Sequence, residues 1–454
     1  MSSRCLDDVR WLTRFLIVLV FGGAVDASDD PRWWKGNLHT HTLWSDGDEF
    51  PEVVAEWYKD RGYHFLALSD HNVLSQGDRW MPVVGVRERA KGEPWRGESF
   101  TPRDAVAGYL ERFGHHWVET RLNPTNGQEQ VRLKPLDEYR TRVEEAGRFL
   151  LIQAEEITTN ATNGRAIHIG AVNIHEWIAT QPGANVQEVM SRTLRVVADS
   201  AARAKRQVLI HVNHPNYKWG VTAEDLAAVV DEDFFEIWNG VDGDNDPGDA
   251  LHPSTDEIWD IANTLRLAVF NAAPLRALAT DDSHHYQGNK VRAKPGRAWV
   301  MVRSRFLTPE HLIRAMRAGD FYASTGVELD DVRFDAAEKT LSVRIRPKDD
   351  ETFVTRFIGT RRGVNVVGRP RLGPDGKVIE TSLDYRTEDG PRIGEVLAEV
   401  SGVEPKYRMT GDELYVRAVV TSTGAPEVPS TEFGFKRAWT QPVGWTVDPK
   451  PSGP

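Results

Sequence analysis

The amino-acid sequence predicts an α/β domain with a parallel sheet, followed by a smaller β-sandwich domain. Strand-like apolar runs alternate with helical patterns between residues 33 and 325, which is typical of parallel α/β architectures. Several of these runs end in histidine or carboxylate residues. After residue 319 the pattern changes to short segments, at 341–347, 355–363 and 414–422, in which apolar and polar residues alternate. An open doubly wound sheet is the alternative for the first part.

The predicted elements of the first part follow one another along the chain. Strands are expected at about 63–69, 150–158, 166–174, 207–213, 233–239, 275–280 and 298–303, and helices at 51–61, 185–206, 222–231, 253–265 and 308–318. An insertion rich in Trp and Arg, at about 75–148, interrupts this alternation. Long insertions often cover a functional site, so we expect either a cap that contacts the substrate or a packed surface elaboration.

The N-terminal segment has the pattern of a secretory signal peptide. Three arginines precede the apolar run 15–25, which is too short to span a bilayer comfortably, and Ala27 follows it. We expect cleavage after about Ala27 and export of the mature chain; an uncleaved anchor is the alternative. The only cysteine, Cys5, lies in this segment, so the mature chain has no disulfide. The expected division is signal peptide 1–27, α/β domain 28–325, β-sandwich 326–447 and tail 448–454.

The charge of the chain argues against a nucleic-acid partner. The formal net charge is −11, and loss of residues 1–27 removes three arginines and three aspartates, which leaves it unchanged. An acidic chain without a basic stripe binds phosphate backbones poorly. We therefore expect a small-molecule substrate, and the sequence carries no signal for the oligomeric state.

The stretch 36–47 (GNLHTHTLWSDG) carries the first candidate metal ligands. Residues two apart in an extended segment project to the same face, so His39 and His41 can present both imidazoles to one point. Imidazole suits Zn, Mn or Fe, and Asp46, at a glycine-containing turn, can add an oxygen ligand.

Similar candidate ligands recur along the later apolar runs. Because the functional face of an α/β sheet lies outside the carboxyl ends of its strands, groups far apart in sequence can converge there. The candidates at strand ends are His71 after 63–69, Glu155 and Glu156 after 150–154, and Asp281, Asp282, His284 and His285 after 275–280. Three more, His168, His211 and His214, lie within or directly after strand-like runs.

Six motifs in this order, HTHTLWSDG, LALSDHN, AEEIT, HIGAVNI, NHPN and DDSHH, resemble those of the PHP (polymerase and histidinol phosphatase) metallohydrolase superfamily over about residues 33–325. The WNG at 238–240 and the DDSHHY before a GRAWV strand are similar to a secreted branch that includes carbaryl-hydrolase-like esterases. The resemblance implies a distorted (β/α)7 barrel. It also implies nine metal ligands: His39, His41, Asp46, His71, Glu156, His168, His214, Asp282 and His284.

Two choices between neighbouring residues depend on this resemblance. It favours Glu156 over Glu155, which would point to the opposite face of its strand. It also favours His214 over His211, which lies inside a strand. Asp70 is expected to orient a ligand or to cap a loop.

The expected chemistry is hydrolysis at a multinuclear metal cluster. Nine ligands exceed the four or so that one zinc ion takes, so two or three divalent ions (Zn, Mn or Fe) are expected. The resemblance implies attack by a metal-bound hydroxide, with Glu156 and Asp46 bridging the metals. His285 or His211 would protonate the leaving group.

The substrate class is left between alternatives. Arg292 and Arg297 either pair with an anionic substrate or lie in an exposed loop. The leading hypothesis is a phosphoesterase; hydrolysis of a carboxyl or carbamate ester is the alternative, favoured by the aromatic insertion, and a non-catalytic metal-dependent binding protein is the third. The acidic loop 242–246 lacks the glutamate that closes a calcium loop, so a solvated turn or a lid is expected there.

Overall fold

The computed structural model describes residues 30–91, 104–287, 291–387 and 390–448. The predicted signal peptide and most of the predicted tail lie outside these residues. Among the described helices, none is long and apolar enough to cross a membrane. Every strand and helix predicted for the first part is present, and its ends differ from the prediction by three residues at most.

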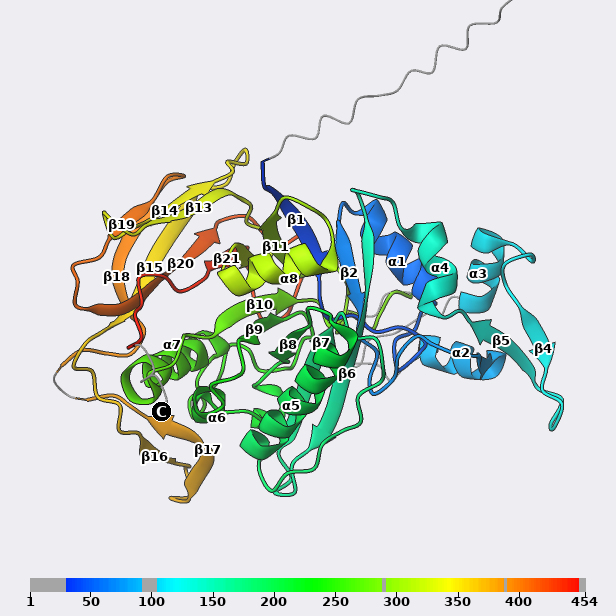
Figure 1. The fold of residues 1–454 in the computed structure, drawn as a ribbon, viewed down its shortest axis with the longest axis horizontal. Coiled ribbons are helices and arrows are strands. Elements are labelled where there is room, and N and C mark those ends of the chain that lie inside the picture. The colour runs from blue at the N-terminus through cyan, green and yellow to red at the C-terminus, as the bar shows by residue number, and fades with distance from the viewer. Residues whose placement is uncertain (1–29, 92–103, 288–290, 388–389, 449–454) are drawn as a thin grey trace, which may run out of the picture. The chain divides into compact units, whose positions relative to one another are not determined.

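A mixed sheet of 13 strands runs through the described chain, in the order β10-β9-β8-β7-β6-β2-β1-β11-β12-β21-β20-β15-β18 (Figure 1). In chain order its strands are β1 (Arg32–Asn37), β2 (Phe65–Leu68), β6 (Leu150–Asn160), β7 (Ala166–Val172), β8 (Leu209–Val212), β9 (Phe234–Asn239), β10 (Arg276–Thr280), β11 (Trp299–Ser304), β12 (Phe321–Ser324), β15 (Phe353–Arg361), β18 (Glu395–Ser401), β20 (Glu413–Ser422) and β21 (Arg437–Thr440).

The sheet is mixed, whereas the sequence predicts a parallel one. β1, β2 and β6 are parallel, as are β8, β9 and β10. β7 runs antiparallel to both of its neighbours. The reason lies in the short connection 161–165 between β6 and β7, because a parallel crossover needs about a dozen residues or more.

The ends of β1 and β10 meet although the two strands are far apart in the strand order. An isolated parallel bridge joins Thr40 to Ser283. The Asp282 amide donates to His39 O and the His41 amide donates to Ser283 O, both at 3.0 Å. Along its length β1 pairs with β11 and not with β10. The described strands therefore form a curled sheet whose two parts meet only at this bridge, and they do not show the closed barrel that the resemblance implies.

Helices pack on both halves of this curled sheet. α5 (Val186–Ala204) contacts β7, α7 (Thr255–Leu265) contacts β9, α1 (Pro51–Asp60) contacts β2 and α8 (Pro309–Ala318) contacts β11 (Figure 1). α6 (Ala223–Ala228) lies between α5 and α7, and α4 (Leu136–Val143) lies against α1. α7 continues into a π-helical turn, Arg266–Phe270, and a 3-10 turn spans Tyr217–Trp219.

The insertion packs against the loop that follows His41. It contains β3 (Arg79–Pro82), α2 (Val83–Lys91), α3 (Ala105–Phe113), β4 (Thr120–Leu122) and β5 (Glu129–Leu133). Its buried residues share a hydrophobic cluster with Leu43, Trp44 and Phe50 of that loop. The Phe50 and Tyr109 rings stack with centroids 3.9 Å apart. The insertion therefore holds the segment that carries Asp46.

The C-terminal residues form two β layers with a common core. β13 (Leu329–Asp335), β14 (Thr340–Ile345) and β19 (Lys406–Arg408) form a small antiparallel sheet, and β16 (Arg369–Leu372) pairs with β17 (Val378–Asp384). Leu341 and Val343 of the small sheet belong to the same hydrophobic cluster as Phe357, Val416 and Val420 of the large one. The two layers share this core, and the β-sandwich itself stays a prediction.

The large sheet continues across the predicted boundary at residues 325 and 326. Tyr322 of β12 pairs with Thr440 of β21, so the last strand joins the sheet that begins in the first part. A buried ion pair adds to this connection: Arg417 of β20 donates to Asp260 of α7 at 2.8 and 2.7 Å. The boundary itself stays a prediction.

Candidate metal centre

His39 and His41 follow β1 and lie fully buried at the point where β1 and β10 meet. Their Nε2 atoms are 3.1 Å apart. Asp282, which follows β10, places Oδ1 2.9 Å from His41 Nε2 and 3.2 Å from His39 Nε2. The bridge between Thr40 and Ser283 fixes this arrangement, because it sets the register of the two segments. Two imidazoles and a carboxylate thus converge on one point.

Glu156, at the end of the buried run in β6, occupies the middle of the cluster. Its Oε1 lies 3.1 Å from His168 Nδ1, 3.2 Å from His214 Nε2 and 3.3 Å from His39 Nε2, and its Oε2 lies 2.6 Å from His71 Nδ1 and 3.5 Å from His41 Nε2. Burial opposes ionisation of this carboxyl, but the surrounding imidazoles hold its pKa well below the usual range. Glu156 therefore stays charged between five histidines.

Glu155 points to the other side of the strand, as strand alternation requires. Its Oε2 accepts a hydrogen bond from the Ile178 amide at 2.9 Å. Burial raises the pKa of Glu155 to about 7. The two adjacent glutamates thus have opposite electrostatic environments, and only Glu156 faces the cluster.

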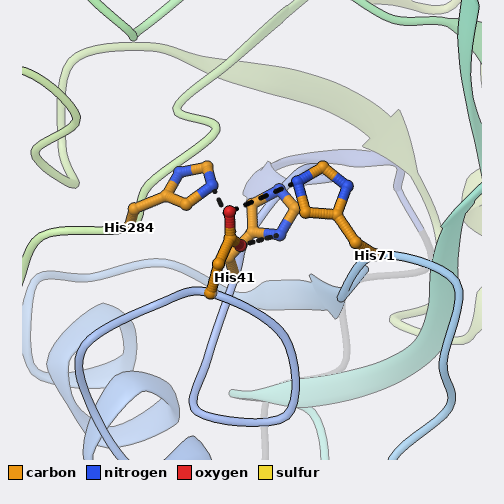
Figure 2. A group of neighbouring side chains, drawn as sticks. His41, His71 and His284 are labelled. Atoms are coloured by element: carbon orange, nitrogen blue, oxygen red, sulfur yellow. Dashed lines mark ion pairs between the residues drawn. The ribbon is translucent and has the colours of Figure 1, made fainter. Parts of the chain in front are cut away.

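Asp46 forms a second group with His41, His71 and His284, the three histidines labelled in Figure 2. Its oxygens lie 3.6 Å from His41 Nδ1, 3.6 Å from His71 Nε2 and 3.3 Å from His284 Nε2. The charges of these histidines lower its pKa below the ordinary range. The group sits at the mouth of the site, since more than half of the Asp46 side chain is exposed.

Asp70 and Gly47 shape the loop that carries Asp46. Asp70 accepts hydrogen bonds from the Thr42 amide at 2.8 Å and from Ser45 Oγ at 2.6 Å, which is the loop-capping alternative of the expectation. A Cβ at Gly47 would lie 2.7 Å from the backbone of His41, closer than real side chains come. The loop can therefore fold back over His41 only with glycine at this position.

Asp244 is a candidate ligand that the sequence reasoning missed. It lies in a group with His214 and Asp282, and burial raises its pKa to about 7. The predicted solvated turn at 242–246 is wrong, because Asp242, Asp244 and Asp246 are each at most 3% exposed. The available signal was a run of carboxylates directly after an apolar strand.

Glu236 lies outside all of the motifs, and Asn213 begins the NHPN motif but was given no role. Glu236 lies in β9 and accepts hydrogen bonds from Thr280 Oγ1 at 2.6 Å and from the His214 amide at 2.9 Å. Asn213 donates from Nδ2 to Glu156 Oε1 at 2.9 Å. A glutamate inside the otherwise apolar run FFEIWN is the signal that would have found Glu236.

The structure brings all nine predicted ligands together. They fall into overlapping groups whose donor atoms lie within 4.8 Å of one another: His41, Asp46, His71 and His284; His39, Glu156 and His214; His39, His41 and Asp282; His71, Glu156 and His168; and His214, Asp244 and Asp282. Each group contains the imidazole and carboxylate ligands that divalent metals take.

The buried oxygens of the cluster test whether these residues fit metal ions. Glu156 Oε2 and Asp282 Oδ1 are buried and accept no hydrogen bond, although histidine nitrogens lie 2.6 and 2.9 Å away. The Nε2 atoms of His39 and His41 face each other at a similar distance. Lone pairs that converge on one point, with no proton between them, are stabilised by a bound cation. The residues of the cluster therefore fit divalent metal ions.

A cavity of about 280 Å³ opens on this cluster. It is lined by Asp46, His71, His168, His214, Tyr217, Val241, Asp244, Asp282, His284, His285, Arg292 and Ala293. Two of the predicted substrate-side residues, His285 and Arg292, are therefore placed at the cavity. The described residues of the insertion do not line it, so the expected cap contact is absent from the part of the insertion that the structure describes.

His211 and Arg297 are placed differently from the expectation. His211 is fully buried inside the sheet, and a Cβ at Gly170 would collide with its ring, so it cannot reach a leaving group in the cavity. Burial lowers the pKa of His211 to about 4. Arg297 is buried and donates to Asp242 Oδ2 at 3.0 Å and to the Gly240, Val291, Arg292 and Pro429 carbonyls, so its guanidinium holds loops together instead of facing the cavity.

Asp281 supports the fold beside the cluster. Its carboxylate accepts hydrogen bonds from the amides of Gly296, Arg297 and Ala298 at 2.7–2.8 Å and from Tyr58 Oη at 2.8 Å. It lies outside the cavity lining, which leaves Asp282 as the carboxylate of this pair that faces the cluster.

Comparisons with known proteins add little to this geometry. No protein-family model and no curated protein sequence matches the chain. One similar solved structure is a two-domain protein from Bacteroides vulgatus containing a predicted PHP-like metal-dependent phosphoesterase (12% identity, 92% of this chain and 96% of that chain covered, TM-score 0.35). Another, from Bifidobacterium adolescentis, is provisionally assigned as a metal-dependent phosphoesterase (14% identity, 59% and 91% covered, TM-score 0.27). Both TM-scores are below 0.5, so we draw no conclusion from the overlap.

Proposed function

We propose that this protein is a metal-dependent hydrolase of phosphate esters. The observation that carries the proposal is the convergence of six histidines and four carboxylates on one open cavity. The overlap of the ligand groups, in which Glu156 is common to two and Asp282 to two others, supports a centre with two or three ions. The motif resemblance to the PHP superfamily, with its distorted barrel, supports the same assignment.

The cluster residues provide carboxylates and imidazoles as ligands for cations. When bound, divalent ions would lower the pKa of a water molecule and polarise a phosphoryl oxygen. Burial, together with the charges of His284 and His71, lowers the pKa of His41 and keeps its ring in the neutral form that binds metals. Glu156 and Asp282 stay ionised, because the histidines around them hold their pKa values well below the ordinary range.

His285 and Arg292 are the residues proposed to act on the substrate. His285 Nδ1 accepts a hydrogen bond from the Ala293 amide at 3.3 Å, so the neutral ring carries its proton on Nε2. From that atom it can protonate a leaving oxygen in the cavity. Arg292 lines the same cavity and can pair with the anionic oxygens of a phosphate group.

Hydrolysis of a carboxyl or carbamate ester is the second candidate, and one observation favours it. A cavity of about 520 Å³ has His285 in its wall, as the metal cavity does, and its other lining residues include Trp57, Tyr286, Val428 and Pro429. Such walls suit an apolar group attached to the ester, as in the secreted branch that the sequence resembles.

A metal-reconstitution assay distinguishes these candidates. The purified protein is stripped of metal, reloaded separately with Mn, Zn and Fe, and assayed with p-nitrophenyl phosphate, bis-p-nitrophenyl phosphate and p-nitrophenyl acetate. We expect metal-dependent turnover of a phosphate ester and its loss in Asp282→Asn. Turnover of the acetate alone would favour the carboxyl-ester hydrolase, and tight metal binding without turnover of any ester would favour a binding protein.

A further inference from the structure

A third cavity, separate from the metal centre, lies on the outer side of β1. It has a volume of about 330 Å³, and its lining includes Trp33, Lys35, Arg61, Trp299, Tyr322 and Arg346. None of its lining residues lines the metal cavity. Trp33 and Lys35 face it because they alternate along β1 with Trp34, whose side chain is in the core.

Lys35 presents a cation to this cavity without an acceptor. Its Nζ lies 3.7 Å from the centre of the Trp299 ring and 4.1 Å from that of Tyr63. Among the described residues, no carboxylate or carbonyl accepts a hydrogen bond from this ammonium group or forms an ion pair with it. Burial lowers the pKa of Lys35 to about 8, although Asp281, Glu427 and Glu328 oppose the shift. Ring faces stabilise a cation, but they leave its three N–H donors unused.

The other charged groups of the wall increase this excess of donors. Arg61 stacks on Trp57 at 4.0 Å and donates to the Trp57 carbonyl, and within the described chain it has no carboxylate partner. Arg346 donates to Glu328 at 2.7 Å and to Asp330 at 2.9 Å. Among the described residues that line the cavity, Glu328 is the only acidic one, and it is already paired with Arg346.

The aromatic walls define the rest of the ligand. Trp33 and Tyr322 form an edge-to-face pair with centroids 5.0 Å apart, and Trp299 forms a further wall. A flat apolar group fits against such faces, and the volume is at the lower end of the range for small-molecule sites. An anion on one side of this group would supply the acceptor that Lys35 lacks.

We propose that this cavity binds a small organic anion, an aromatic carboxylate, with the carboxylate on Lys35 and the ring against Trp33 and Trp299. Arg61 at the rim adds a second positive charge. The site does not depend on the metal centre, because the two cavities have no residue in common. The proposal therefore stands or fails independently of the proposed hydrolase.

Calorimetric titration with benzoate tests the proposal. Benzoate is titrated into the full-length, metal-loaded protein, and the neutral amide benzamide is titrated in parallel. We expect one benzoate site in the wild-type protein. Benzamide should bind the wild type about tenfold or more weakly than benzoate does, and benzoate should bind Lys35→Met about tenfold or more weakly, because each change removes a charge-assisted hydrogen bond. Absence of benzoate binding, or equal affinity for benzoate and benzamide, would overturn the proposal.

A matched lysine variant separates this cavity from the metal centre. Lys218 also lies over a tyrosine ring, that of Tyr217, which lines the metal cavity. Lys218→Met should leave the benzoate affinity unchanged. Weaker benzoate binding in Lys218→Met, with unchanged binding in Lys35→Met, would place benzoate at the metal cavity and refute the proposal. If Lys35→Met does not fold, the test uses Arg61→Gln at the exposed rim. We expect this variant to bind benzoate about threefold or more weakly than the wild type. Unchanged affinity in that folded variant would also refute the proposal.

Discussion

The Nδ1 atom of His39 lies 2.8 Å from Glu236 Oε1, and both side chains are fully buried. An imidazole that donates a hydrogen bond from Nδ1 presents the lone pair of its Nε2 atom. The contact with Glu236 therefore fixes the tautomer of His39 and turns its Nε2 toward His41 and Asp282. Hydrogen bonds of this kind orient metal-binding histidines and increase their basicity.

Glu236→Gln should weaken metal binding about 10- to 100-fold, because the amide loses the charge that orients His39. Competition of the metal-loaded protein against a chelator measures the change. Glu232→Gln is the matched control, since Glu232 is a fully buried glutamate just before the same strand and outside the metal groups. Equal metal affinity in the two variants would show that the contact with His39 does not support the centre.

Glu156→Gln should reduce metal content and lower activity by several orders of magnitude, because it removes a negative charge from between five histidines. Glu155→Gln should be milder, with losses of at most about 10- to 100-fold, since that side chain faces Ile178. Metal analysis and turnover are measured on both proteins. A more damaging Glu155→Gln, in a folded protein, would show that the ligand assignment on this strand is wrong.

Active protein should contain two to three metal equivalents, because the candidate ligands form several overlapping groups. Asp244→Asn should lower this number or weaken the last equivalent, because Asp244 completes the group with His214 and Asp282. Elemental analysis after dialysis gives the stoichiometry. Asp249→Asn, on the exposed part of the same loop, is the control and should retain the wild-type metal content. A single equivalent in fully active protein would contradict the multinuclear centre.

The stability of the protein should fall between pH 4.5 and 8 partly because of Glu232. Burial raises the pKa of Glu232 from 4.5 to about 8, so the folded chain keeps a proton that the unfolded chain releases. Its contribution is fully present below pH 4.5 and is lost as the pH rises to about 8. Glu232→Gln, which cannot ionise, should therefore melt at a higher temperature than the wild type at pH 9, with a gain on the order of 5 kcal/mol at most.

Melting curves followed by circular dichroism at pH 5 and pH 9 test this expectation. At pH 5 the wild type and Glu232→Gln should differ far less than at pH 9. Glu338→Gln, at an exposed turn, is the control and should show the same difference from the wild type at both values. A Glu232→Gln protein that is no more stable than the wild type at pH 9 would contradict the buried, protonated carboxyl.

The mature N-terminus should lie near Ser28, as the pattern of arginines, apolar run and small residue predicts. N-terminal sequencing of protein recovered from the periplasm or the medium of an expressing bacterium checks this. An intact Met1 in that fraction would contradict cleavage and favour the uncleaved anchor.

The sequence predicts much of the centre because its ligands follow regular local geometry. His39 and His41 project to one side because residues alternate along an extended segment. The same rule places Glu155 and Glu156 on opposite faces, but only the resemblance to the PHP superfamily indicated which of the two faces the cluster. The ends of parallel strands lie at one edge of a sheet, which explains why Asp282, far along the chain, joins them. Such rules depend only on neighbours in sequence or on the strand pattern.

The remainder depends on tertiary packing that a local pattern does not contain. Glu236 stands in an apolar strand, where spacing gives no indication that its partner is His39. Asp244 lies in a loop whose carboxylates look solvated until the fold buries them. Arg297 looks like a free cation in the sequence, yet carbonyl groups from three separate segments surround it.

The buried pair of Arg417 and Asp260 makes completion of the α/β part depend on residues far along the chain. Without β20, Asp260 of α7 would lack its guanidinium partner, and without β21 the core around Trp259 would lose Trp439. The edge of β10 also needs Gln441, whose side chain pairs with both backbone groups of Ala277. During synthesis, the part of the chain that carries the candidate ligands therefore cannot complete its core until residue 441 has left the ribosome. Until then its unpaired groups and apolar surface stay exposed to aggregation.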